Sequence, residues 1–211
     1  MTTINAASDA LYSKLWRTRG ARFISRDRYL CMSLLSVSCI SILSVYVIAL
    51  SVIGIVFQKD FTDMGSNVLN ALNVSISVAI LAFSLIEGSR NHLGKSDTMN
   101  DCALAIGRIY DEFSLQYRFG TVTLDVLEAT TKRYSDILDK YRLNHSLSDY
   151  EKFLPQHPDP SIRRPFLFFL IRPWKSAIWW FQTIWIYTVG AISPPLIIFG
   201  LCYAFWGKLI R

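Results

Sequence analysis

The chain contains three long stretches without charged side chains. Cys31 to Phe57 has no charged side chain and exceeds the ~20 residues that cross a bilayer core as a helix. It is also too long for the apolar part of a signal peptide, about 7–15 residues. The stretch from Asn67 to Ile86 is long enough for a second span, and the short segment 58–66 connects it to the first span. The pattern therefore predicts a two-span transmembrane hairpin over residues 31–86.

The third stretch, Ser176 to Trp206, predicts an additional C-terminal transmembrane helix. Trp180 and Trp206 lie about 39 Å apart along a helix, close to the ~40–45 Å between the interfacial layers where Trp concentrates. Pro194 and Pro195 fall inside this stretch, and each removes a backbone donor, so we expect a kink there. A shallow re-entrant hairpin broken at these prolines is the alternative.

The residues between the second and third stretches show helical periodicity. Apolar side chains recur every three or four residues from Met99 to Tyr117, which places them on one helix face. Phe119-Gly120 then interrupts the pattern, as glycine often does just past a helix end. A heptad series follows and continues to His145; its apolar positions form a candidate oligomer seam of Leu124, Leu127, Tyr134, Leu138 and Tyr141. The seam has few large aliphatic residues, so we expect it to pack against other subunits or against the N-terminal helix.

Together these patterns predict an all-α membrane protein with a transmembrane helical hairpin, a cytoplasmic helical-hairpin extension and a third transmembrane helix. The expected segments are a basic N-terminal helix (1–30), the hairpin (31–86), the helical extension (87–154), a Pro-rich linker with an interfacial segment (155–175) and the kinked third helix (176–206).

Charge sets the expected orientation. Residues 1–30 carry six Lys and Arg against two Asp, whereas the 58–66 loop carries one Lys against two Asp. The positive-inside rule therefore predicts a multi-pass membrane protein with its N-terminus and helical extension in the cytoplasm. Three spans would place the C-terminus outside.

Composition agrees with a membrane protein. The chain is 52% hydrophobic and 18% charged, compared with roughly 25% charged residues in soluble domains, which argues against a soluble enzyme. The formal net charge is +6, and in an apolar chain such an excess of basic residues more often orients the protein in a membrane than binds nucleic acid. Aromatic and arginine side chains mix in the first thirty residues, and although such a mixture can bind single-stranded nucleic acid, its position before a span favours binding to anionic lipid.

The sequence offers no catalytic motif. It contains no glycine-rich phosphate loop, GxSxG or HExxH, and the three histidines are far apart, so we expect no enzyme activity, cofactor or metal. An intramembrane lipid enzyme would need an ionisable residue at membrane depth, which all three stretches lack.

The second stretch instead carries a polar stripe. At 100° per residue, four polar side chains fall within about 60° of one another on one helix face: Asn70, Asn73, Ser77 and Ser84. Such residues either hydrogen-bond between packed helices or line a water-filled path in an oligomer. For the asparagines both interpretations stay open, whereas the serines of the spans favour packing.

Three motifs resemble the SLATT family of bacterial two-transmembrane effectors over residues 8–155. They are Leu85-Ile86-Glu87-Gly88-Ser89-Arg90-Asn91, Cys102-Ala103, and Tyr134-x-x-Ile137-Leu138-x-Lys140-Tyr141-x-x-Asn144-His145. The third stretch departs from the two-span pattern of that family.

This resemblance implies an antiviral conflict-system effector that forms homo-oligomers and permeabilises the inner membrane. It also implies a partner encoded nearby, either a nucleotide second-messenger synthase or a reverse transcriptase. The alternative is a membrane-tethered adaptor that recruits a soluble partner through its helical extension, and ion leakage would distinguish the two.

Overall fold

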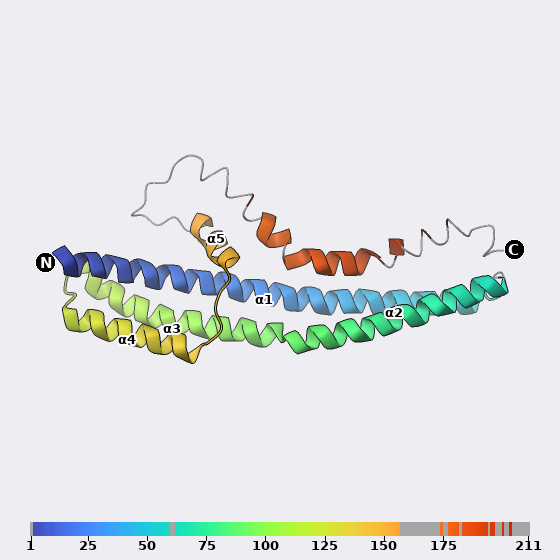
Figure 1. Cartoon of the computed structure of the whole chain (residues 1–211), viewed down its shortest axis with the longest axis horizontal. Coiled ribbons are helices and arrows are strands. Elements are labelled where there is room, and N and C mark those ends of the chain that lie inside the picture. Colours follow the sequence, from blue (N-terminus) through green and yellow to red (C-terminus); the bar gives the residue numbers. More distant parts are fainter. Residues whose placement is uncertain are drawn as a thin grey trace. The chain divides into compact units, whose positions relative to one another are not determined.

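The computed structural model describes residues 2–59, 62–156, 174, 177–181, 183–193, 195, 196, 200 and 203. Every regular element in this part of the chain is a helix, as the sequence predicts (Figure 1). The helices are α1 (Thr2–Val56), α2 (Asp63–Arg90), α3 (His92–Arg118), α4 (Leu124–Lys140) and α5 (Leu147–Gln156), followed by a short apolar helix, Thr183–Ser193.

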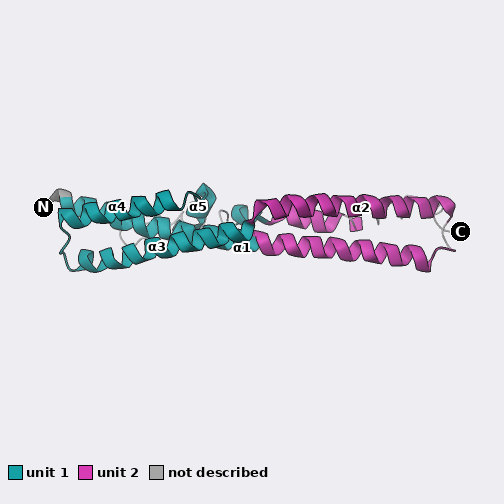
Figure 2. Ribbon diagram, turned by 90° about the horizontal axis from the view of Figure 1, so that it is seen from below, with its two compact units in different colours: residues 1–31, 92–183 teal, residues 32–91, 184–211 magenta. Residues whose placement is uncertain are grey.

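The chain divides into two compact units (Figure 2). Unit 1 consists of residues 1–31 and 92–183, and unit 2 of residues 32–91 and 184–211, so that α1 contributes to both. The chain leaves unit 2 at Asn91, which has a left-handed backbone (φ 45°) and caps α2 by donating its N–H to the Gly88 carbonyl. α3 begins at His92, directly after this cap.

Unit 2 contains the transmembrane hairpin. The described residues include two helices that are long and apolar enough to cross a membrane, within Ile4–Val56 and Asp63–Phe119. Thr62 caps α2, because its hydroxyl accepts a hydrogen bond from the Gly65 N–H at 3.1 Å. Many apolar side chains of the hairpin are exposed in the single chain, among them Val45, Val74 and Leu81. This surface is suited to lipid or to neighbouring helices.

Unit 1 has a core formed by α1, α3 and α4. The α3 face predicted from periodicity is buried, with Met99, Cys102 and Ile106 fully covered. In the main cluster, Cys102, Ile106, Ile109 and Phe113 of α3 pack with Leu11 and Leu15 of α1 and Tyr134 of α4. α3 ends just before Gly120, which has a positive φ of 67°.

Two boundaries in unit 1 differ from the sequence-based expectation. α4 ends at Lys140, so Tyr141 and His145 lie in a non-helical segment and the heptad series does not continue as a helix. The sequence pattern does not predict α5, which includes Pro155 at the start of the expected linker. Ser146 and Asp149 start α5 as a capping pair, in which each backbone N–H donates to the side chain of the other.

The third stretch is described only in part. Pro195 has helical backbone, whereas Pro194 lies outside the described residues, and so do residues 157–173 of the Pro-rich linker. The kink, and the choice between a single span and a re-entrant hairpin, therefore stay predictions.

Candidate functional site

A polar groove of about 330 Å³ lies between α1 and α2 in unit 2. Its polar lining consists of Ser51 of α1, of Ser66, Asn70 and Asn73 of α2, and of Gln58 in the turn that follows α1. Gly54 of α1 allows the helices to approach closely here, because a Cβ at this position would lie 3.1 Å from the Leu69 side chain.

Asn73 connects the two helices within this lining. Its side-chain nitrogen donates to the Ser51 hydroxyl at 2.8 Å, and that hydroxyl donates in turn to the Val47 carbonyl at 2.9 Å. The Asn73 Oδ1 atom is buried and has no hydrogen-bond partner among the described residues. An unmatched amide oxygen is costly in an apolar environment, so this atom requires water or a polar group beyond the residues that the structure describes.

The groove contains only half of the predicted polar stripe. Asn70 lines it and is exposed, without a hydrogen bond to any residue that the structure describes. Ser77 and Ser84 lie outside the groove lining. The Ser77 hydroxyl donates to the Asn73 carbonyl at 2.8 Å within its own helix, so it needs no further partner. Of the four residues in the predicted stripe, the two asparagines therefore line the groove.

Sequence reasoning missed Gln58 and Ser66 as groove residues. Both fall in the connecting segment 58–66 that the pattern predicts, because the uncharged stretches end at Phe57 and begin at Asn67. The signal that places Ser66 on α2 is Thr62-Asp63, a helix cap followed by an acidic first turn.

Glu87 anchors the Thr183–Ser193 helix to the hairpin within unit 2. Its side chain is buried, accepts a hydrogen bond from the Tyr187 hydroxyl at 2.9 Å and pairs with Arg90 at 2.7 Å. The thiol of Cys39 donates to the Tyr187 carbonyl at 3.6 Å on the same side. The Leu85–Asn91 motif therefore has a structural role, since its Glu87 carboxylate accepts the hydrogen bond from Tyr187 of the Thr183–Ser193 helix.

Comparison with protein families decides the identity of the domain. The family model described as SMODS and SLOG-associating 2TM effector domain family 5 matches residues 4–201. The chain belongs to this SLATT family. The match extends to residue 201, beyond the residues 8–155 that carry the sequence resemblance, and so covers most of the third stretch. Searches of curated proteins and of solved structures return no match.

Membership agrees with the two long apolar helices and makes the chain a two-transmembrane effector-domain protein. The SLATT effector domain is not a known enzyme family.

The predicted oligomer seam of this SLATT domain packs within its own unit 1. Tyr134 is buried in the core, and Leu127, Leu138 and Tyr141 pack against it. Leu124 is the exposed member, with 54% of its surface accessible. The seam therefore contacts the N-terminal part of α1, one of the two options expected from sequence. Contact with another subunit stays a prediction.

Unit 1 of the SLATT domain also contains a buried ionic cluster that sequence reasoning missed. The Asp149 side chain is fully buried and accepts from the Arg28 side chain and from Trp179 Nε1, at 2.9 and 3.1 Å. Burial raises the pKa of Asp149, but the hydrogen bond and charge of Arg28, helped by Trp179 and Ser146, bring that pKa below its ordinary value. Arg28 is thus an internal ion-pair partner rather than a lipid contact.

Proposed function

We propose that this chain is a membrane effector of a bacterial antiviral conflict system, which forms homo-oligomers and permeabilises the inner membrane. The polar groove between α1 and α2 is the observation that carries the proposal. It supplies the Asn73 Oδ1 atom and the exposed Asn70 amide, both without a hydrogen-bond partner within the described residues, on helices otherwise covered by apolar side chains.

Assembly into an oligomer would give partners both to the asparagine amides of the groove and to the exposed apolar side chains of the hairpin. Lipid solvates exposed apolar side chains but cannot hydrogen-bond to amides, and an unsatisfied amide at membrane depth costs several kcal/mol. Hairpins arranged around a common axis would turn Asn70 and Asn73 toward one another and toward water, with Val45 and Val74 free to contact lipid or adjacent hairpins. A water-filled path lined by amides is the expected result.

The basic N-terminal segment supports an orientation with unit 1 in the cytoplasm. There it would meet the trigger, which we propose to be a nucleotide signal or a partner protein. A nucleotide second-messenger synthase or a reverse transcriptase encoded nearby would provide that signal.

Flux measurements on two leucine variants test the pore. The full chain is reconstituted in liposomes loaded with a self-quenched dye, as wild type, Asn73→Leu and Ser75→Leu, at a protein density at which the wild type releases dye without the trigger. Ser75 is the control, because its hydroxyl donates to the Ala71 carbonyl at 2.7 Å and it is absent from the polar groove. We expect Asn73→Leu to insert and assemble but to release less dye, while Ser75→Leu behaves as wild type.

Other outcomes define what the groove does. If Asn73→Leu loses oligomers and flux together, the asparagine packs helices and does not line the path. If Asn73→Leu keeps both wild-type oligomers and wild-type release, the groove has neither role and the pore proposal fails.

A membrane-tethered adaptor is the second candidate. It is favoured by apolar side chains exposed on unit 1, including Leu115, Phe119 and Leu147, which a soluble partner could cover. An adaptor would recruit its partner without releasing dye, so the same liposome assay distinguishes the two functions.

A further inference from the structure

Arg22 is a buried cation without a counter-ion in the described part of the chain. It lies on α1 with 3% of its surface exposed. Its Nη1 atom donates to the Leu143 carbonyl oxygen and lies 3.6 Å from Met99 Sδ. The Nε atom is buried and has no hydrogen-bond partner. A buried guanidinium whose hydrogen-bond acceptors among the described residues are a carbonyl and a thioether has a large desolvation cost, which an anion would offset.

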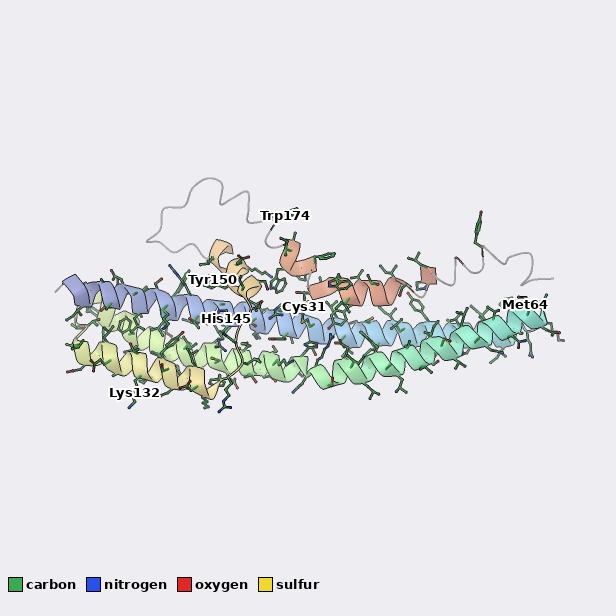
Figure 3. The ribbon with its side chains drawn as sticks, in the orientation of Figure 1. Cys31, Met64, Lys132, His145, Tyr150 and Trp174 are labelled. Carbon is green, nitrogen blue, oxygen red and sulfur yellow. The ribbon has the colours of Figure 1, made fainter. Side chains whose placement is uncertain are left out.

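Arg22 also lines a pocket of about 220 Å³ in unit 1, at the end of α4. The lining is otherwise Thr18, Tyr134, Leu138, Tyr141, Arg142, Leu143, Asn144 and His145, so it contains two arginines and no acidic residue. His145, labelled in Figure 3, is half-buried there, and its Nδ1 atom has no hydrogen-bond partner among the described residues. The pocket thus combines excess positive charge with unused polar atoms.

The chemistry of these groups suits a phosphate. Guanidinium groups bind phosphate oxygens through paired N–H donors, and phosphate presents several strong acceptor oxygens to donors on different sides. The pocket is smaller than the ~300–1,000 Å³ of sites for drug-sized ligands, so it fits one phosphate group better than a whole large ligand. The Asn144 Oδ1 atom accepts from the His145 N–H at 3.0 Å, which holds the non-helical segment in place beside Arg142.

We propose that this pocket binds the phosphate group of a small phosphate monoester, with Arg22 and Arg142 as the charged contacts. The source is either a soluble phosphorylated molecule or a monoester lipid headgroup. This site goes beyond the pore proposal and is independent of it, since binding does not require the hairpin to conduct ions.

The environment of His145 agrees with an anion site. Burial lowers the pKa of His145, Arg22 lowers it further, and Asp149 on α5 raises it. A dianion beside the imidazole would raise this pKa. Binding of phosphate should therefore shift the His145 resonances in a pH titration followed by NMR.

Titration of inorganic phosphate into the full chain tests the site. The protein is held in maltoside micelles after lipid removal, and binding is measured by calorimetry in wild type, Arg142→Gln and Arg108→Gln. Arg108 is the matched control, an exposed arginine on α3 outside the pocket. We expect saturable binding that weakens roughly tenfold in Arg142→Gln, the effect of losing one charge-assisted hydrogen bond, and is unchanged in Arg108→Gln.

Arg22→Gln should abolish binding, with its circular dichroism spectrum as a check of folding. The exposed Arg142 variant keeps the test valid even if the buried substitution unfolds unit 1. The proposal is overturned if wild type shows no saturable binding, if Arg108→Gln weakens binding as much as Arg142→Gln, or if acetate competes as well as phosphate.

Two further monoesters identify the source. Glycerol 3-phosphate and short-chain dihexanoyl phosphatidic acid have the same phosphate chemistry but differ in acyl chains. Tighter binding of glycerol 3-phosphate supports a soluble ligand, and tighter binding of phosphatidic acid supports a lipid headgroup. Failure of both to displace phosphate would overturn the monoester assignment.

Discussion

Arg28 of α1 and Asp149 of α5 form a two-pronged ion pair, in which the Arg28 Nε and Nη2 atoms each donate at 2.9 Å to a different carboxylate oxygen. The Asp149 side chain is fully buried and the Arg28 side chain is 16% exposed. Because Trp179 donates to the same carboxylate, this pair joins three segments of unit 1 that are far apart in sequence. Removing one partner of a buried pair costs more than forming the pair gains, since the other charge is left unmatched.

Asp149→Asn should therefore destabilise unit 1 by about 3 kcal/mol, the lower end of values for breaking a buried ion pair. We expect faster proteolytic cleavage near α5 and a lower unfolding temperature of the full chain in detergent. Asp111→Asn is the control, because its pair with Arg19 is longer, at 3.5 Å, and largely exposed. Equal stability of Asp149→Asn and wild type would show that the pair does not hold α5 in place.

Stability should also depend on pH through His145. Burial, and secondarily Arg22, lower the pKa of His145, while Asp149 raises it. The unfolded state, with an ordinary pKa of about 6.5, then binds a proton that the folded state resists, so stability falls as pH decreases below about 6.5. His145→Gln should show a flatter stability profile from pH 6.5 to pH 5. A profile as steep as that of wild type would assign the loss to other groups.

Parts of this fold and site follow directly from local sequence patterns. An uncharged run such as Asn67–Ile86 predicts a spanning helix, because side chains at membrane depth are predominantly apolar and the backbone there must satisfy its own hydrogen bonds. The α3 face from Met99 to Phe113 is readable from its spacing, since a helix repeats every 3.6 residues. The same periodicity places Asn70 and Asn73 on one face, and both line the groove.

Other features depend on contacts that no local pattern encodes. The pairing of Arg28 with Asp149 requires α5 to return to α1, and nothing in either segment specifies that return. The heptad series gave the wrong helix end because α4 stops at Lys140, although apolar residues continue at heptad spacing beyond it. The Ser146–Asp149 capping pair was a usable local signal for α5.

Oligomer contact through the seam is best tested at Leu124. The other seam residues pack in the core of unit 1, so Leu138→Asp would unfold that core and weaken oligomers indirectly. Leu124 is 54% exposed, and we expect Leu124→Asp to weaken crosslinked oligomers without changing the unfolding temperature. Leu104→Asp, at a residue of α3 that is 48% exposed, is the control. Unchanged oligomers in Leu124→Asp would place the subunit interface elsewhere.

The number of spans can be tested with reporter fusions at two positions. The described residues contain two spanning-length helices, and the third stretch contributes the Thr183–Ser193 helix, held by Tyr187 to Glu87. With a cytoplasmic N-terminus, a single third span places a reporter fused after Arg211 outside, where alkaline phosphatase is active and a green fluorescent protein is not. Fusion after Gly120, between α3 and α4, should give the opposite result and serves as the control. If the green fluorescent protein fused after Arg211 fluoresces and alkaline phosphatase fused there is inactive, the third stretch re-enters the membrane and does not cross it.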